Sequence, residues 1–172
     1  EKAGPQTSVQ LTGGEPTIYS ELPDFISHIK EIGLKVKLDT NGTNPAMIKR
    51  LADQNLIDYI AMDIKNSPEK YRDTAGNPAL SMDDIKESVS VIISSKVDYE
   101  FRTTVVSELH TEDDMVAIGR WVKGAKAYYL QSYADSGDVI SPGFTCPRKE
   151  TLYRYRDILN SYVDFVAIRG ID

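Results

Sequence analysis

Strand-like segments alternate with helical segments along almost the whole chain. The strand-like segments are rich in β-branched and aromatic residues and are bounded by turn-forming residues. They lie at residues 8–12, 35–40, 59–65, 99–106, 127–133 and 163–169. Strands that alternate with helices pair in parallel through right-handed crossovers. The sequence therefore predicts an α/β fold, and we expect a single domain over residues 1–172.

Capping signals and apolar residues at helical spacing mark the helices between these strands. Four predicted helices start with an N-cap residue, an N1 proline or a capping box, at Ser20, Pro45, Ser81 and Thr111. A last helix is predicted from about Lys149 to Asn160. Gly33 is predicted to end the first helix. The segment 66–80 is predicted to be the longest polar loop.

The strands alternate between apolar and polar residues. In the second strand, Val36 and Leu38 share one face while Lys37 and Asp39 share the other. Burying such charges away from water and without partners would cost several kcal/mol each. We therefore expect the polar faces to line a cavity that holds water or a polar ligand. A doubly wound sheet would show near-continuous aliphatic strands, and a packed eight-stranded barrel needs about 250 residues. A partly open barrel fits this chain best.

Charge and composition exclude several classes of protein. Lys plus Arg total 20 and Asp plus Glu total 26, which gives a formal net charge of −6 and argues against a nucleic-acid surface. No apolar run approaches the length of about 20 residues that a membrane span needs, so we expect no membrane partner. One cysteine, Cys146, cannot form an internal disulfide or a cysteine-ligated cluster by itself. A reducing cytoplasm is the expected location.

The predicted carboxyl ends of the strands carry a mixed set of charges. Ligand sites in parallel α/β folds form at these ends. The end segments are 12–16, 39–42, 63–65, 102–104 and Gln131. Carboxylates together with lysine and arginine suit a zwitterionic ligand, whose ammonium would lie near the carboxylates.

Purely structural interpretations stand beside this one. The segment 13–16 could be a tight turn into a helix, and Asp39 could cap the turn that follows it. Asp63 with Lys65 could be a solvated pair on one strand, and Arg102 could be an ion-pair partner of Asp63. For His28 and His110 we favour structural roles.

Four motifs together resemble radical S-adenosylmethionine (SAM) enzymes. They are VQLTGGEPT at 9–17, KLDTNG at 37–42, AMDIK at 61–65 and FRTTVV at 101–106. Within that superfamily the chain is most similar to activating enzymes of glycyl radical proteins, in particular those of anaerobic ribonucleotide reductase. The resemblance implies a partial (β/α) TIM-like barrel, of which this chain would be the C-terminal part.

The resemblance also implies binding roles for individual residues. Residues 13–15 would engage the amino group of SAM, and residues 64–66 would border its ribose and carboxylate. Arg102 would neutralise a carboxylate, and Gln131 would contact the ribose or adenine. Asp39, Thr40 and Asp63 resemble a monovalent-cation site near the SAM carboxylate. The residues assigned to SAM or the cation are thus Gly13, Gly14, Glu15, Asp39, Thr40, Asp63, Ile64, Lys65, Asn66, Arg102 and Gln131.

In the superfamily a [4Fe–4S] cluster reduces SAM, and a 5′-deoxyadenosyl radical then abstracts a hydrogen atom from the substrate. For an activating enzyme that substrate is a glycine of a partner glycyl radical enzyme, and the reductant is a protein such as flavodoxin or ferredoxin. The cluster is held by CxxxCxxC in the loop after the first barrel strand, upstream of GGEP. This sequence has only Cys146. We therefore expect that the first strand and the cluster loop precede Glu1, and that this chain alone is inactive.

Two other functions stay open on the sequence. One is a non-catalytic domain that binds SAM or a nucleotide, or docks a partner. The other is a partial-barrel aldolase or isomerase using Lys65 and Asp63, which we rank last because a Schiff-base lysine needs an apolar setting. Loss of a preceding strand would expose the edge at residues 8–12, where we expect self-association or lower stability.

Overall fold

The computed structural model describes residues 7–134 and 143–171, and these form two compact units. The first unit comprises residues 7–63 and 83–99, and the second comprises residues 64–82, 100–134 and 143–171. The expectation of one domain over residues 1–172 stays a prediction.

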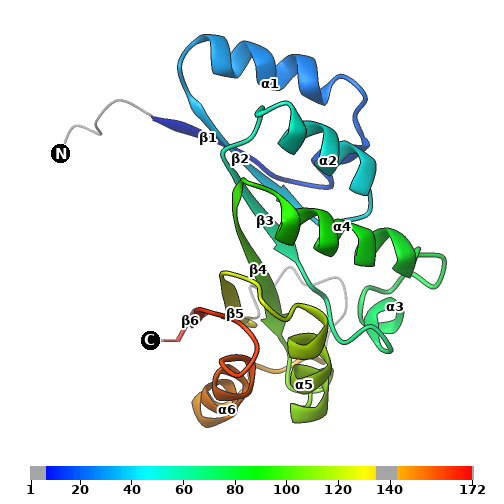
Figure 1. The fold of residues 1–172 in the computed structure, drawn as a ribbon. Helices are drawn as coiled ribbons and strands as arrows, with labels where there is room; N and C mark the ends of the chain where they lie inside the picture. The colour runs from blue at the N-terminus through cyan, green and yellow to red at the C-terminus, as the bar shows by residue number, and fades with distance from the viewer. Residues whose placement is uncertain (1–6, 135–142, 172) are drawn as a thin grey trace. The chain divides into compact units, whose positions relative to one another are not determined.

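The first unit holds three parallel strands in the order β1-β2-β3. Its strands are β1 (Ser8–Leu11), β2 (Lys35–Thr40) and β3 (Tyr59–Asp63). Its helices are the 3-10 helix η1 (Pro16–Ile18), α1 (Leu22–Glu31), α2 (Pro45–Asp53) and α4 (Met82–Ser94). The first residue of α4, Met82, belongs to the second unit. Figure 1 shows α1, α2 and α4 on one side of these strands.

The predicted alternation along the strands of the first unit holds only in part, because Asp39, Thr40 and Ala61 are buried like their apolar neighbours. Val36, Leu38 and Ile60 are fully buried, as are the helix residues Ile26 and Ile48. Burial of each large aliphatic side chain contributes about 1.5–3 kcal/mol. The side chains on the other face of β1 and β2 make polar contacts with one another. Asp39 contacts both Gln10 and Lys37 there. This second face of the strands therefore carries the polar chemistry of the unit.

Two of the predicted helix boundaries in the first unit can be compared directly with the structure. Gly33 has a φ of 82° and its N–H donates to the carbonyl of Lys30 over 2.9 Å, which confirms it as the end of α1. Ser20 was expected to cap α1, and this is wrong. The N-cap residue is Glu21, and its side chain makes no capping bond. The N–H of Leu22, the first residue of α1, donates to the carbonyl of Tyr19 over 3.2 Å.

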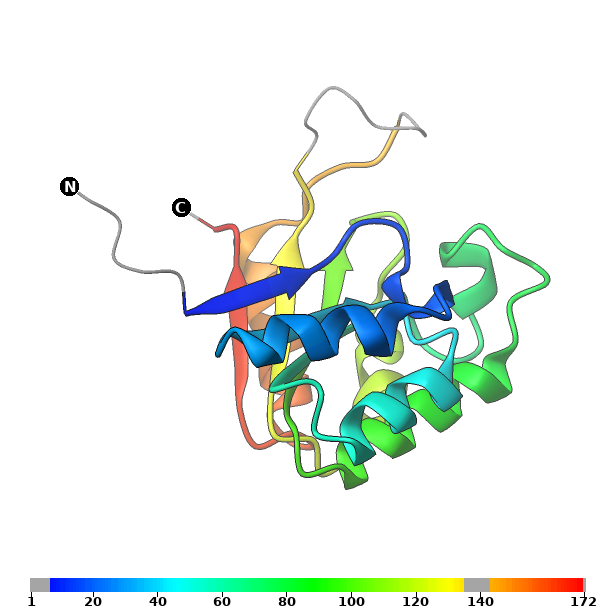
Figure 2. The ribbon, with the colours of Figure 1, turned by 90° about the horizontal axis from the view of Figure 1, so that it is seen from above.

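The second unit also holds three parallel strands, in the order β4-β5-β6. The strands are β4 (Asp98–Val105, apart from its first two residues), β5 (Tyr128–Ser132) and β6 (Val166–Arg169). The helices are α3 (Tyr71–Thr74), α5 (Glu112–Trp121) and α6 (Lys149–Leu159). α6 packs on α5 and on β5 and β6. In Figure 2 the three strands are coloured green, yellow and red.

Local interactions explain where the second unit follows the sequence prediction and where it does not. The capping box of Thr111 and Asp114 is confirmed at the start of α5. The predicted loop 66–80 contains the short helix α3, because the buried ring of Tyr71 packs edge-on against Trp121. The last strand begins at Val166 instead of Val163, whose N–H still donates to the carbonyl of Leu159 at the end of α6.

Other predicted bounds shift slightly. β3 ends at Asp63, two residues before the predicted end at Lys65, and the N–H of Ile64 donates to the carbonyl of Arg102. β1 pairs with β2 along one edge, and self-association through its other edge stays a prediction. None of the helices among residues 7–134 and 143–171 has the length and apolar character required to cross a membrane.

Candidate functional site

Glu15 links the turn after β1 to the end of β2 inside the first unit. Its Oε1 accepts hydrogen bonds from the Thr17 N–H (3.2 Å), the Thr17 hydroxyl (2.6 Å) and the Thr40 hydroxyl (2.8 Å). Its Oε2 accepts the N–H of Asn41 over 2.6 Å. Glu15 is 8% exposed. The GGEP and DTNG motifs, which are far apart in the sequence, therefore meet through this one carboxylate.

The two glycines of the same turn leave its main chain open. Gly13 has a φ of 88° and Gly14 a φ of 48°, values that favour glycine. A Cβ added at either residue would meet no atom within 4 Å. The peptide groups at residues 13 and 14 can therefore be approached closely by a ligand.

Asp39 lies at the carboxyl end of β2 and is 6% exposed. Its Oδ2 accepts a hydrogen bond from the Gln10 side chain over 2.8 Å, and its Oδ1 lies 3.9 Å from Lys37 Nζ. Lys37 also lies over the ring of Tyr59, 5.4 Å from its centroid. The carboxylate is thus fixed by a neighbour on β1 and partly balanced by a lysine on its own strand.

Two further residues of the first unit belong to the predicted cation site. The hydroxyl of Thr40 donates to Glu15 and accepts the N–H of Gly42 over 3.1 Å, and Thr40 is 3% exposed. Asp63 is the last residue of β3 and is half-buried. No group of three or more His, Cys, Asp or Glu side chains suited to a metal occurs among the described residues. The predicted monovalent-cation site at Asp39, Thr40 and Asp63 contains only two such side chains, and it stays a prediction.

Ile64, Lys65 and Asn66 follow β3 and belong to the second unit. Ile64 is 1% exposed, and its carbonyl accepts the hydroxyl of Thr103 over 2.7 Å. The carbonyl of Lys65 lies 2.9 Å from Nε2 of His110. Asn66 is fully buried, and its amide donates to the Thr74 hydroxyl and to the Leu109 carbonyl. The side chains of Ile64 and Asn66 are therefore engaged within the unit.

His110 has the structural role that the sequence favoured. It is 4% exposed, and besides Lys65 its ring contacts the main chain of Val106. The hydroxyl of Tyr155 donates to the carbonyl of His110 over 2.7 Å. Burial raises the pKa of the Tyr155 hydroxyl above its ordinary value. His28 lies exposed on α1.

The remaining predicted residues lie on the strands of the second unit. Arg102 pairs in register with Tyr129, and Gln131 pairs with Thr104 and with Arg169. Both Arg102 and Gln131 are half-buried. Next to them, Arg169 lies over the ring of Tyr129 at 3.4 Å from its centroid.

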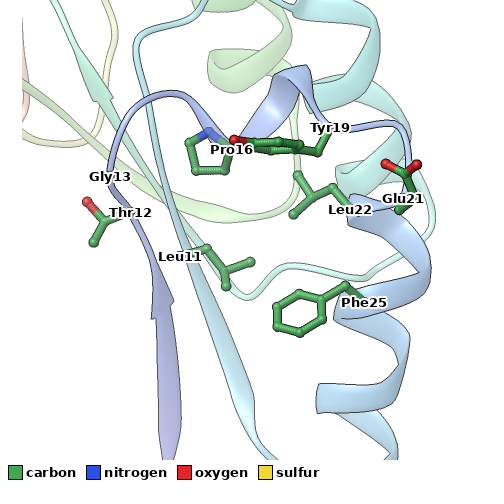
Figure 3. Close-up of a pocket in the computed structure, with 8 residues that line it drawn as sticks. All are labelled: Leu11, Thr12, Gly13, Pro16, Tyr19, Glu21, Leu22 and Phe25. Carbon is green, nitrogen blue, oxygen red and sulfur yellow. The ribbon is translucent and has the colours of Figure 1, made fainter.

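A hollow of about 400 Å³ lies between β1 and α1 in the first unit and shares Thr12 and Gly13 with the turn after β1 (Figure 3). Apolar side chains dominate its lining, and Leu11, Leu22 and Phe25 are labelled there together with Tyr19. Its polar side chains are Thr12, Glu21 and the hydroxyl of Tyr19. A zwitterion would leave most of its hydrogen bonds unmade in such a place, so we do not assign the polar ligand to it.

The residues of this chain do not fit an iron–sulfur cluster. A [4Fe–4S] cluster is held by cysteine thiolates, and the sequence contains the single cysteine Cys146. That thiol is exposed, and its Sγ lies 3.2 Å from the hydroxyl of Ser132. We therefore assign no step of the chemistry to a cluster held by this chain.

Several residues that build this geometry were not singled out from the sequence. Thr17 and Asn41 anchor Glu15, Gln10 orients Asp39, and Asn44 donates to the Thr17 carbonyl over 2.7 Å. Thr17 lies two residues after a glutamate that precedes a proline, and this spacing is a local capping signal that could have indicated it. The other contacts join residues distant in sequence and left no local pattern.

Comparison with known proteins identifies the class to which this fold and these motifs belong. Residues 1–122 match the family model of the radical SAM superfamily, and the chain belongs to that superfamily. A relative of narrower description is MJ1227 of Methanocaldococcus jannaschii, which is named for the activation of glycyl-radical enzymes. It is 32% identical over 172 residues, which cover 96% of this chain and 71% of that protein.

Solved structures show the same fold. A domain of pyruvate-formate lyase-activating enzyme from Bacteroides vulgatus superposes with a TM-score of 0.73 at 17% identity, covering 95% of this chain and 99% of that one. Streptococcus suis SuiB bound to S-adenosylmethionine gives a TM-score of 0.68 at 13% identity, covering 95% of this chain and 39% of SuiB. The predicted fold class, an α/β partial (β/α) TIM-like barrel, is thus confirmed.

Proposed function

We propose that this chain is the SAM-binding part of an enzyme that installs a glycyl radical on a partner protein. Membership of the radical SAM superfamily supports the use of SAM, and the similarity to MJ1227 supports the activating role. SAM, when bound and reduced, supplies the 5′-deoxyadenosyl radical that abstracts a hydrogen atom. The residues of this chain bind and orient SAM, while the cluster, its reductant and the partner enzyme are supplied from outside the described residues.

The observation that carries the proposal is the junction of the GGEP and DTNG motifs through Glu15. The junction places two open glycine peptide groups beside a buried carboxylate within one unit. Main-chain carbonyls with a nearby carboxylate suit an ammonium group, which donates hydrogen bonds and carries a positive charge. We propose that the turn at residues 13–15 holds the amino group of the methionine moiety.

Asp39, with Thr40 and Asp63, is proposed to serve the same ligand or a monovalent cation beside it. On the sequence pattern alone, we also propose roles toward SAM for residues 64–66, Arg102 and Gln131. For Ile64 and Asn66 such contacts would come through the main chain, because both side chains are buried and that of Asn66 is also hydrogen-bonded within the second unit.

Calorimetric titration of this chain with SAM and with adenosine tests the proposal. Both ligands share the adenosine part, and only SAM carries the amino-acid part. If the turn holds the amino group, SAM binds at least about tenfold more tightly than adenosine, which corresponds to about 1.4 kcal/mol. Equal affinities for SAM and adenosine, or no binding of SAM, would contradict the proposal.

A matched pair of glycine variants locates the binding. Gly14 and Gly76 both have positive φ, 48° and 62°, and a Cβ added at either meets no atom within 4 Å. The cost in stability should therefore be similar for Gly14→Ala and Gly76→Ala, about 1 kcal/mol each. Only Gly14→Ala places a methyl group where SAM is proposed to bind, so it alone should weaken SAM binding.

A further inference from the structure

We propose that Glu15 and Thr40 act as positioning residues for SAM. They belong to a strut, a set of hydrogen bonds that joins the turn after β1 to the turn after β2. Direct contact with the ligand is not their main role. The inference rests on the proposed function. It differs from the sequence-based expectation, in which Glu15 engages the amino group and Thr40 belongs to a cation site. The strut is defined here as Thr17, Glu15, Thr40 and Asn41.

The hydrogen bonds of Glu15 indicate this role. A carboxylate oxygen has about two lone-pair sites, and Oε1 already receives three donors, two from Thr17 and one from Thr40. Oε2 receives the N–H of Asn41 over 2.6 Å. A ligand ammonium would have to compete with these short, charge-assisted bonds. The carboxylate is thus engaged mainly by the protein itself.

Thr40 is engaged in the same way. A hydroxyl has one proton, and that of Thr40 is donated to Glu15 over 2.8 Å, while its oxygen accepts the N–H of Gly42. Thr17 is fully buried and Thr40 is 3% exposed, so these two side chains face the protein interior. The side chain of Thr40 therefore acts on Glu15 and on the Gly42 turn.

The turn needs such a support. Two glycines in sequence give the chain at residues 13 and 14 wide conformational freedom, and ordering it on binding would cost affinity. The strut fixes the residue directly after these glycines to the end of β2, and the bond from Asn44 to the Thr17 carbonyl adds a second tie. The peptide groups at residues 13 and 14 are thereby held ready for the ligand.

The test compares variants that remove or keep the Thr40 hydroxyl. Thr40→Val removes the donor to Glu15, and Thr40→Ser keeps it. We expect Thr40→Val to weaken SAM binding about tenfold, the loss of roughly one hydrogen bond to a charged group, and Thr40→Ser to stay within about twofold. Ile48→Val is the control: Ile48 is fully buried in the same unit, so this variant lowers stability without touching the strut. It should leave SAM affinity unchanged.

A double variant separates a strut from direct contacts. If Glu15 acts through Thr40, then Glu15→Gln weakens binding and adding Thr40→Val weakens it little further, because both changes break one unit. If Glu15→Gln weakens binding while Thr40→Val leaves it unchanged, Glu15 contacts the ligand directly and the inference is overturned. Equal losses in Thr40→Val and Thr40→Ser would overturn it as well.

A measurement on the Asn41 amide without SAM tests the strut independently of the proposed function. The Asn41 N–H that donates to Glu15 should give a downfield amide proton signal and slow hydrogen exchange, and both should be lost in Glu15→Gln. If the wild-type chain shows this signal but binds no SAM, the proposed function fails, and with it the role of the strut in binding. If SAM binds but the Asn41 amide exchanges freely, the strut alone is wrong.

Discussion

Arg169 and Glu100 form a two-pronged ion pair in the second unit, with Nη1–Oε1 and Nη2–Oε2 distances of 2.9 Å each. Their exposure is unequal, because the side chain of Glu100 is 3% exposed and that of Arg169 is 40% exposed. The hydrogen bonds from Glu100 raise the pKa of the Arg169 guanidinium above its ordinary value. The pair thus secures a buried carboxylate on β4 to the last residue of β6.

This asymmetry predicts unequal costs for removing the two partners. Arg169→Met leaves the buried Glu100 charge without its partner and should lower the free energy of unfolding by about 3 kcal/mol. Glu100→Gln leaves an arginine that reaches water and should cost about 1–2 kcal/mol. Urea unfolding of both variants measures the difference. Equal costs, or a larger cost for Glu100→Gln, would contradict this account of the pair.

Asp114 predicts a loss of stability in acid. Burial raises its pKa, but hydrogen bonds from Lys70, Thr111 and Ser67 more than offset this and hold the pKa below its ordinary value. Because the folded-state pKa is lower than the unfolded one, near 3.9, the contribution is present above about pH 4 and is lost as the pH falls further.

Thermal unfolding between pH 6 and pH 2.5 checks this prediction. Asp114→Asn should be less stable than the wild type by about 1–2 kcal/mol at pH 6, and the difference should shrink toward pH 2.5. A difference that stays constant across this range would show that the charge of Asp114 contributes nothing.

Gly42 is predicted to be less tolerant of a side chain than Gly33. Both have positive φ, 78° and 82°, but a Cβ at Gly42 would collide with the methyl group of the buried Met62, whereas at Gly33 it meets no atom within 4 Å. Gly42→Ala should therefore cost about 2–3 kcal/mol and Gly33→Ala about 1 kcal/mol. Adding Met62→Leu should recover part of the Gly42→Ala loss, and urea midpoints that show no recovery would exclude the collision as the cause.

Anaerobic reconstitution with iron and sulfide tests whether this chain holds a cluster. One cysteine cannot supply the thiolates that a [4Fe–4S] cluster needs, so we expect no stoichiometric absorbance of a bound cluster. Cys146→Ala should behave identically. A full cluster in both the wild type and the variant would contradict the assignment of the cluster ligands to residues outside this chain.

The sequence predicted the fold better than it predicted the site. The glycine that ends α1 and the capping box of Thr111 depend on neighbours within a few residues, and both are confirmed. Burial along β2 alternates only from Lys35 to Leu38, because Asp39 and Thr40 are buried as well. Helix α3 was missed because the packing of Tyr71 on Trp121 overrides a polar local sequence. At the candidate site, the GGEP and DTNG motifs indicated the turns after β1 and β2, which meet through Glu15.

The bonds that engage Glu15 could not be foreseen in the same way. The acceptors of its carboxylate are filled partly by Thr40 and Asn41, which lie on another strand end. A sequence pattern records that a glutamate is present, but it does not record whether its oxygens face a ligand or the protein. The roles of the predicted site residues toward SAM stay proposals for this reason.

The central claim is that SAM is held by the turn after β1, and amide chemical shifts measured during a SAM titration test it most directly. The account predicts that the largest shifts fall on residues 12–15 and 39–42, where the GGEP and DTNG motifs meet, with little change on Leu22 and Phe25 in the apolar hollow. Shifts centred on Leu22 and Phe25, or no shifts at saturating SAM, would contradict it.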